Sequence, residues 1–148
     1  MLGLRDRIQR RKQDMATKPI RTFSKPWFGP RKALNLVNKQ VHGRKVTLQE
    51  RAMVSLLRVE AKLKKRKQPI PLIVVQSFRT HAEQRAIYNS GVRPAAQPGT
   101  SWHEQGIAVD IYFKPRDLSA IRKAFKSEGW HQFDPVNDPG HFSKGVTG

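Results

Sequence analysis

The sequence predicts an α+β fold in which helices flank a small, mostly antiparallel sheet, preceded by a basic N-terminal arm. Three observations lead to this fold class. Helical and strand patterns alternate after the first third of the chain, the last connections are too short for several parallel crossovers, and positive charge is concentrated at one end. A length of 148 residues suits one folded domain. We therefore divide the chain into an arm, residues 1–45, and a domain, residues 46–148.

Almost all of the excess positive charge lies in the first half of the chain. Residues 1–68 contain 20 Lys and Arg against 4 Asp and Glu, a net charge of +16, while the remainder is nearly neutral at +2. Residues 1–45 also contain three prolines and no sustained periodicity, which is typical of a flexible or loosely docked arm. We expect Leu34, Leu36 and Val37 to form a short element that packs on the domain.

The first helix is predicted over residues 47–65. Thr47 and Glu50 form a T-x-x-E capping box, the pattern of a helix N-terminus. The basic run at residues 62–67 suits the negative end of the helix dipole, and Pro69 stops the helix. The apolar stripe expected to face the core consists of Leu48, Val54, Leu57 and Ala61, with Leu56 and Leu63 flanking it.

A buried strand and a second helix are predicted next. Residues 72–75 are apolar and mostly β-branched, which is typical of a buried strand. Thr80 opens a second T-x-x-E capping box, so we expect a helix over residues 80–90, which Gly91 ends. The proline-containing stretch at residues 92–100 is predicted to be a loop.

The last predicted elements are two strands separated by a helix. Residues 107–113 alternate strictly and predict a strand whose odd-numbered side chains face the core, with Asp110 on the opposite face. A helix is expected over residues 118–127, with Asp117 as its N-cap. A short strand is expected around His141.

The composition excludes several classes of protein. The chain has no cysteine, which excludes disulfide scaffolds, zinc fingers, iron–sulfur sites and thiol catalysis, so any metal must be held by histidines and carboxylates. No stretch of about 18 apolar residues is present, so no membrane-spanning helix is expected. The N-terminal sequence MLGLRDRIQRRK lacks an apolar core, and we therefore expect synthesis in the cytoplasm without a secretory signal.

Two histidines and one carboxylate in the second half form a candidate metal site. His103 and Asp110 are seven residues apart, which would place them on opposite faces of a straight strand, but Gly106 permits a bend that brings them together. His141 lies in a separate segment, three residues after Asp138. Two histidines and one carboxylate leave a fourth position for water, as in catalytic rather than structural zinc sites.

Residues 101–110, SWHEQGIAVD, resemble the S-x-H-x-x-G-x-A-x-D signature of the VanY-type zinc peptidases. That family includes D-alanyl-D-alanine carboxypeptidases and dipeptidases, and the L-alanyl-D-glutamate endopeptidases of phage endolysins and bacterial wall hydrolases. Further matches are S-F-R-T with E-Q at residues 77–84, P-G-T at residues 98–100, and G-W with D-x-x-H-F at residues 129–142. The resemblance covers about residues 46–145.

The resemblance implies a role for each matched residue. His103, Asp110 and His141 would bind Zn²⁺, which polarises the scissile carbonyl and activates water. Asp138 would be the general base and acid, and Arg79 would lie near the substrate and the metal as a second catalytic residue. Substrate contacts or support are expected from Ser101, Gln84 and Trp130.

Three further ionisable residues compete for roles at this site. Glu104 is adjacent to a proposed ligand and is the alternative base, although its backbone direction should point it away from the metal. His131 is an alternative ligand or substrate contact, for which a surface role is the preferred interpretation. His81 lies in the first turn of a predicted helix and is expected to be exposed.

Together these features predict a zinc-dependent peptidase that hydrolyses peptidoglycan stem peptides. Aspartate rather than glutamate at position 138 favours the L-alanyl-D-glutamate bond, as in phage lysins, and a D-alanyl-D-alanine carboxypeptidase is the alternative. An alternative of another class is an inactive protein on the same fold that binds a polyanion such as the cell wall or DNA.

The basic arm is expected to bind polyanions in a salt-dependent manner. With a wall hydrolase attached, an anionic wall polymer or lipopolysaccharide is the favoured partner of the arm, and nucleic acid is the second choice. We expect a monomer that acts on the cell wall, which it reaches through a holin, on lysis or with a virion.

Overall fold

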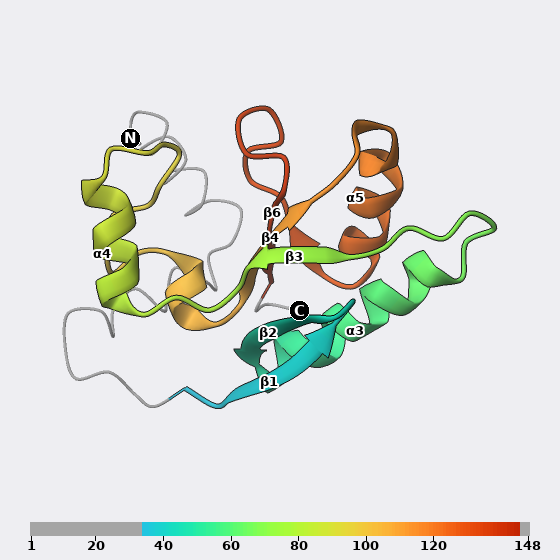
Figure 1. Cartoon of the computed structure of the whole chain (residues 1–148), viewed down its shortest axis with the longest axis horizontal. Coiled ribbons are helices and arrows are strands. Elements are labelled where there is room, and N and C mark those ends of the chain that lie inside the picture. The colour runs from blue at the N-terminus through green and yellow to red at the C-terminus, as the bar shows by residue number, and fades with distance from the viewer. Residues whose placement is uncertain (1–33, 146–148) are drawn as a thin grey trace.

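In a computed structural model of the chain, which describes residues 34–145, two antiparallel sheets and three α-helices surround one core (Figure 1). A two-stranded sheet pairs β1 (Leu36–Val41) with β2 (Arg44–Gln49). A four-stranded sheet has the order β3 (Ile73–Gln76), β4 (Ala108–Tyr112), β6 (His141–Lys144), β5 (Trp130–His131). The helices are α3 (Glu50–Lys64), α4 (His81–Asn89) and α5 (Leu118–Ser127), with short 3₁₀ helices η3 (Trp102–Gln105) and η4 (Pro115–Asp117). All strand pairs among these residues are antiparallel, which confirms the predicted fold class.

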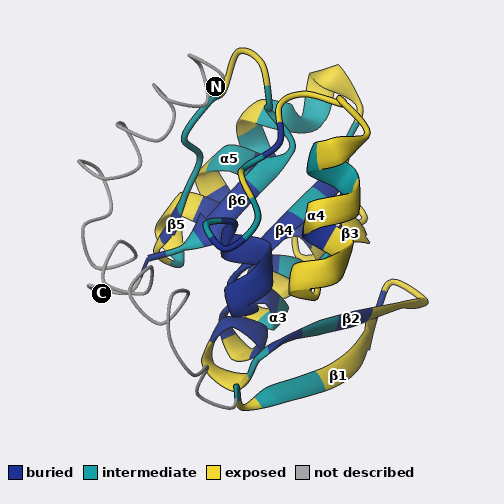
Figure 2. Ribbon diagram, turned by 90° about the vertical axis from the view of Figure 1, so that its left-hand side faces the viewer, coloured by how far each residue is buried: buried dark blue, intermediate teal, exposed yellow. Residues whose placement is uncertain are grey.

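The two faces of the four-stranded sheet have different environments. Val109 pairs with Phe142, and the ring of Phe142 stacks on that of Phe125 in α5 with centroids 4.1 Å apart. This face is therefore packed against helix, and Figure 2 shows the buried residues gathered along β4, β6 and the neighbouring segments. Asp110 and His141 form the next pair and point to the other face, because successive side chains of a strand alternate.

The β1–β2 hairpin lies where the sequence predicts the end of the arm and the start of a helix. Its two-residue loop, His42 and Gly43, has φ values of 50° and 76°, the conformation of a type I′ turn. Val41, Val46 and Leu48 are fully buried. The division drawn after residue 45 thus falls within β2, and we propose that the domain begins before β1, whereas residues 1–33 lie outside the described part of the chain.

The predicted capping box at the start of the first helix is wrong. Thr47 lies in β2, where its hydroxyl donates a hydrogen bond to Asn38 of β1, and α3 begins at Glu50 with Gln49 as N-cap. Strand pairing satisfies the Thr47 side chain and leaves it unavailable as a cap. Of the short element expected at Leu34, Leu36 and Val37, the last two residues lie in strand β1, and Val37 packs on the core.

The predicted apolar stripe of α3 also differs from its buried face. Val54 is 44% exposed, Ala61 is exposed, and Leu48 belongs to β2. The helix starts three residues later than predicted. Its buried side is the side that contacts the hairpin and α5, which the sequence pattern alone does not identify. That side consists of Ala52, Met53, Ser55, Leu56, Val59 and Leu63.

Helices α4 and α5 agree with their sequence patterns, whereas the strand predicted to be buried at residues 72–75 is the edge strand β3, in which Val75 is 42% exposed, and strand β5 was not predicted. Thr80 forms a complete capping box with Glu83 at the start of α4, and Gly91 follows the helix with φ of 86°. Helix α5 has the predicted bounds, although the Asp117 side chain makes no capping hydrogen bond. Among residues 34–145, no helix is long and apolar enough to cross a membrane.

Replacing Val41 with alanine should test whether the hairpin belongs to the cooperative unit. The side chain is fully buried, so removing two methyl groups should lower the free energy of unfolding by about 1.5–3 kcal/mol. Gln40→Ala, at the exposed neighbouring position, is the control and should change it by less than about 0.5 kcal/mol. Urea denaturation measures both variants, and equal midpoints would show that β1 contributes nothing to the core.

Candidate metal centre

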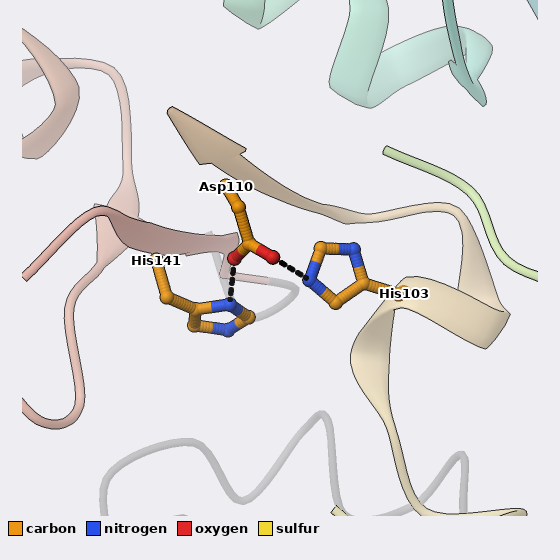
Figure 3. A group of neighbouring side chains, drawn as sticks. All are labelled: His103, Asp110 and His141. Carbon is orange, nitrogen blue, oxygen red and sulfur yellow. Dashed lines mark hydrogen bonds and ion pairs between the residues drawn. The ribbon is translucent and has the colours of Figure 1, made fainter. Parts of the chain in front are cut away.

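The antiparallel register of β4 and β6 places two of the predicted ligands side by side. Asp110 and His141 are directly opposite each other in this pair, so their side chains project from the same face of the sheet. Asp110 Oδ1 lies 2.8 Å from His141 Nδ1. Figure 3 shows the carboxylate between the two imidazole rings, with His141 on one side and His103 on the other.

A tight turn before β4 brings His103 to the same carboxylate. Ser101 caps η3, and its Oγ accepts a hydrogen bond from the backbone N–H of His103 at 3.2 Å. Gly106 ends η3 with φ of 72°, and a Cβ there would lie 2.7 Å from Leu36 Cδ2. Only glycine suits both the positive φ and this close approach. The turn leaves His103 Nε2 3.2 Å from Asp110 Oδ2.

The donor atoms fit a divalent metal ion. A carbonyl oxygen can only accept, so the 2.7 Å contact between His103 Nδ1 and the Ser77 carbonyl places the ring proton on Nδ1 and leaves Nε2 with its lone pair. That Nε2 is buried and has no hydrogen-bond partner among the described residues. His141 Nε2 lies 3.0 Å from Ser143 Oγ, so its Nδ1 can likewise face a metal. Outer hydrogen bonds of this kind orient histidine ligands in metal sites.

The three ligand atoms also have the separation and the donor chemistry that Zn²⁺ requires. One atom from each of His103, Asp110 and His141 lies within 4.8 Å of the others. Two imidazole nitrogens and one carboxylate oxygen are the donors found in catalytic zinc sites. The residues present therefore fit zinc without the help of cysteine.

The electrostatics of the group keep the carboxylate ionised. Burial alone would raise the pKa of Asp110, but the adjacent imidazole of His103 and the hydrogen bond with His141 hold that pKa well below its usual value. Burial lowers the pKa of His103, and Asp110 offsets only part of this effect. Burial also acts to lower the pKa of His141, but its hydrogen bond to Asp110, the charge of Asp110 and that of Asp138 raise it overall.

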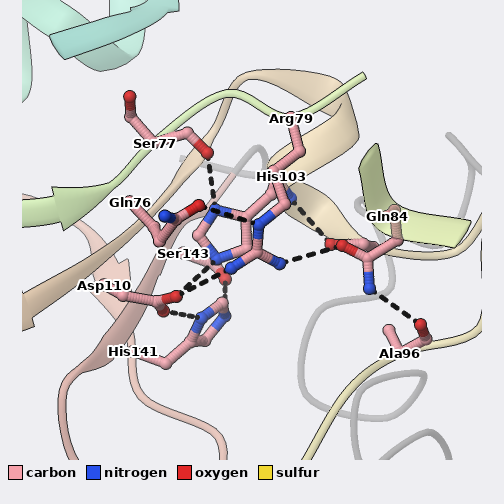
Figure 4. Close-up of polar contacts among 10 residues, drawn as sticks. Gln76, Ser77, Arg79, Gln84, Ala96, His103, Asp110, His141 and Ser143 are labelled. Carbon is pink, nitrogen blue, oxygen red and sulfur yellow. Dashed lines mark hydrogen bonds and ion pairs between the residues drawn. The ribbon is translucent and has the colours of Figure 1, made fainter. Parts of the chain in front are cut away.

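Arg79 is fixed at the base of the site by three acceptors (Figure 4). Its Nη2 donates to Asp110 Oδ2 at 3.1 Å, its Nη1 to Gln84 Oε1 at 2.9 Å, and its Nε to Gln76 Oε1 at 3.1 Å. Gln84 is completely buried and also donates from Nε2 to the Ala96 carbonyl at 2.8 Å. Gln84 thus joins Arg79 to the loop after α4.

An open pocket lies over His103, Asp110 and His141, which we call the metal group because they could hold a metal ion. Asp138 forms part of the pocket wall. Asp138 is held by a turn in which its N–H donates to the Asp134 carbonyl at 2.8 Å and the His141 N–H donates to the Asp138 carbonyl at 3.2 Å. Asp134 also lines the pocket and accepts a hydrogen bond from the Asn137 N–H at 3.0 Å. The pocket therefore contains an acidic wall beside the three ligand atoms.

Several residues singled out in the sequence lie elsewhere. Trp130, a predicted substrate contact, is 3% exposed, and its Nε1 donates to Ser55 Oγ of α3 at 2.8 Å, so it packs in the core away from the pocket. The Glu104 side chain is buried and points away from the metal group, as predicted: its Oε1 lies 3.0 Å from His81 Nδ1, and its Oε2 accepts from the Gly99 N–H at 2.8 Å. His131 stacks on Phe133 with ring centroids 6.1 Å apart.

Sequence reasoning missed the residues that orient the ligands and complete the pocket. Ser143 shares a strand face with His141 two positions earlier, a signal that the sequence does contain. The roles of the Ser77 carbonyl and Asp134 depend on contacts between distant segments and have no local signal. Phe133 was also missed: it lines the pocket beside Trp102, an aromatic residue that the sequence did suggest for the cleft, with ring centroids 4.2 Å apart.

The fold and the site together have the features expected of a mononuclear metal hydrolase: two histidines and one carboxylate on a small antiparallel sheet, open to a pocket with a further carboxylate. The chain belongs to the VanY family of D-alanyl-D-alanine carboxypeptidases, whose family model matches residues 45–133. This result confirms the resemblance seen in the sequence. The matched range includes His103 and Asp110 and ends before Asp138 and His141, which the structure brings to the same pocket.

Three solved structures share this fold. VanYB in complex with D-alanine-D-alanine is 18% identical, with a TM-score of 0.62 over 80% of this chain and 81% of that chain. A mutant of the vancomycin-resistance D,D-pentapeptidase VanY in complex with Zn(II) is 18% identical, with a TM-score of 0.58 over 74% and 78%. DacB from Streptococcus pneumoniae is 12% identical, with a TM-score of 0.51 over 74% and 81%. No curated protein sequence matches the chain.

Proposed function

We propose that this chain is a zinc-dependent D,D-carboxypeptidase that removes the terminal D-alanine from peptidoglycan stem peptides. The observation that carries this proposal is the meeting of His103, Asp110 and His141 in one pocket whose wall includes Asp138. The family description supports this substrate class, as do the neighbouring structures that hold D-alanine-D-alanine and Zn(II).

In this proposal each polar residue of the pocket has a separate task. Zinc, when bound, would act as a Lewis acid that polarises the scissile carbonyl and lowers the pKa of water. The Asp138 carboxylate takes a proton from the attacking water and delivers it to the departing amine. Its place on the pocket wall beside His141 is the basis for this role.

Arg79 acts through charge and positioning. Its hydrogen bond to Asp110 Oδ2 fixes the carboxylate that links the two histidines. Its side chain is only 13% exposed, so its positive charge lies in a low-dielectric region beside the pocket, where it stabilises negative charge that develops on the substrate oxygen. Gln84 and Gln76 hold the guanidinium in this position.

The second candidate function is cleavage of the bond between L-alanine and D-glutamate, and the observation that favours it is aspartate at position 138. An aspartate is one methylene shorter than the glutamate of the carboxypeptidase branch, which suits a different distance between base and substrate. Delivery through a holin, on lysis or with a virion, and binding of an anionic wall polymer or nucleic acid by the arm, stay predictions.

Mass spectrometry of purified murein and of a synthetic pentapeptide after digestion tests the proposal. We expect release of free D-alanine by the zinc-loaded protein and none by the chelator-treated protein. A new amino terminus on D-glutamate, without free D-alanine, would establish the endopeptidase instead. If neither product forms with zinc bound, the chain is an inactive member of the family that acts by binding alone.

A further inference from the structure

The loop that follows α4 supplies an arginine to the wall of the pocket. Val92, Arg93, Pro94, Ala95 and Ala96 line the same pocket as His103 and Asp138. Val92 and Arg93 are exposed, whereas Ala95 is buried beneath them. Arg93 is therefore a charged side chain at the pocket rim, carried by a segment that Gln84 anchors from inside through the Ala96 carbonyl.

The guanidinium of Arg93 is held in one orientation. It lies over the ring of Tyr88, with Cζ 4.1 Å from the ring centroid. Nη1 donates to the carbonyl of Tyr88 at 3.0 Å and to the carbonyl of Val92 at 2.8 Å, which accounts for both of its hydrogens. Among residues 34–145, no acceptor bonds to Nε or Nη2, so the edge formed by these two nitrogens stays available. Two parallel N–H groups on such an edge match the two oxygens of a carboxylate.

The two arginines of the pocket have different availability. Arg79 has a side chain that is 13% exposed and donates to Asp110, Gln84 and Gln76, so its guanidinium is committed to the base of the site. Arg93 contacts carbonyl groups and an aromatic ring, and no carboxylate among the described residues neutralises it. Of the described residues that line the pocket, Arg93 is therefore the cation best placed for a substrate anion.

Three carboxylates share the pocket wall with the two arginines, so a cation at the rim would favour the approach of a substrate anion. Asp110, Asp134 and Asp138 all line the pocket and would repel a carboxylate. A stem peptide that ends in D-alanine carries an α-carboxylate one residue from the scissile amide. The D-glutamate of the second candidate bond also carries one, because its chain continues through the side-chain carboxyl. Both substrates therefore present the same chemical group next to the bond that is cut.

We propose that Arg93 is a specificity-determining residue whose Nε–Nη2 edge binds the free α-carboxylate adjacent to the scissile amide. This inference rests on the proposed function for the identity of the substrate. It explains why the enzyme would prefer a bond next to a carboxylate. The Arg93 side chain is already held by the Tyr88 ring and two carbonyl groups, so it loses little conformational freedom when it binds the substrate carboxylate.

Paired substrates that differ only in this group test the inference. The zinc-loaded full-length protein is given a peptide ending in D-alanyl-D-alanine and the same peptide with a C-terminal amide. A second pair contains L-alanyl-D-glutamate with its α-carboxylate free or amidated. Calorimetry measures binding of all four peptides, and initial rates give KM and kcat for those that are cleaved.

We expect Arg93→Gln to weaken binding and raise KM for the carboxylate form by about tenfold to 100-fold, the cost of one lost hydrogen-bonded ion pair, with little change for the amide. Arg93→Lys should restore part of the lost affinity, because lysine keeps the positive charge but lacks the two parallel N–H groups of the guanidinium. Arg85→Gln, an exposed arginine of α4 outside the pocket, is the matched control and should behave as the parent.

The binding and rate measurements separate this inference from the proposed function. If the parent protein prefers the carboxylate peptides, and Arg93→Gln abolishes the preference without any peptide being cleaved, the role of Arg93 stands and the proposed activity fails. If the parent cleaves D-alanyl-D-alanine but Arg93→Gln keeps the parent's preference, the activity stands and the inference is overturned. A parent protein that does not distinguish acid from amide in either pair also overturns it.

Discussion

Replacing Asp138 with asparagine is expected to lower kcat by about 10²–10⁴-fold, the usual contribution of a general acid–base group, while leaving the zinc content unchanged. Asparagine keeps the size of the side chain but cannot take up the proton from water at neutral pH. The zinc content should persist because Asp138 lies outside the group formed by His103, Asp110 and His141. Rates on the synthetic pentapeptide, with metal analysis of the same samples, measure both quantities.

A matched control for this variant is Asp117→Asn. Asp117 lies in η4, where its carboxylate forms an ion pair with Arg116 at 3.9 Å, and it does not line the catalytic pocket. Turnover close to the parent's in Asp138→Asn would contradict the assignment. Asp134 would then be the next carboxylate to test, because both oxygens of Glu104 are directed to His81 and Gly99.

Alanine at His103 or His141 should remove zinc and, with it, turnover. Each substitution deletes one of three donors, and the loss of affinity should exceed the about 10–100-fold that replacement of an outer-sphere partner costs. Zinc per protein, measured by atomic emission after dialysis, is expected to fall from about one to near zero. Circular dichroism of the same samples should show that the secondary structure persists, since neither histidine belongs to the hydrophobic core.

His131→Ala is the control for these ligand variants. This histidine is half-buried near the pocket and stacks on Phe133, yet it lies outside the ligand group, so zinc binding should persist. Full zinc occupancy after replacement of His103, Asp110 and His141 together would show that the metal is bound elsewhere. Loss of zinc from His131→Ala would place this residue among the ligands instead.

Much of the fold could be predicted because its elements have strong local patterns. The capping box at Thr80, the strict alternation around Asp110 and the positive-φ glycine after α4 each depend only on neighbouring residues. The hairpin was missed because its exposed positions carry lysine, arginine and asparagine, which look like an unstructured basic arm. The signal was the alternation of Val46 and Leu48 after a His-Gly turn.

In the candidate site, residues close together in sequence could be predicted, whereas those placed by contacts between distant segments could not. His103 and Asp110 lie in one short signature, and the bend expected at Gly106 occurs in the structure. The sequence leaves open whether Trp130 lines the pocket or packs in the core, because the partner that decides its position, Ser55, is 75 residues away in sequence. Contacts of this range follow from the packing of whole elements, so a local pattern around Trp130 could not distinguish a pocket wall from the core.

The long-range contacts of the site determine when during synthesis it can form. Gln49 of the hairpin holds the Gln105 carbonyl across 56 residues, and Asp110 meets His141 across 31 residues. A growing chain that has not reached β6 contains His103 and Asp110 but neither the third donor nor the strand that closes the sheet beside them. Partly made chains therefore cannot assemble the three ligand residues, and the site can form only once nearly the whole domain has left the ribosome.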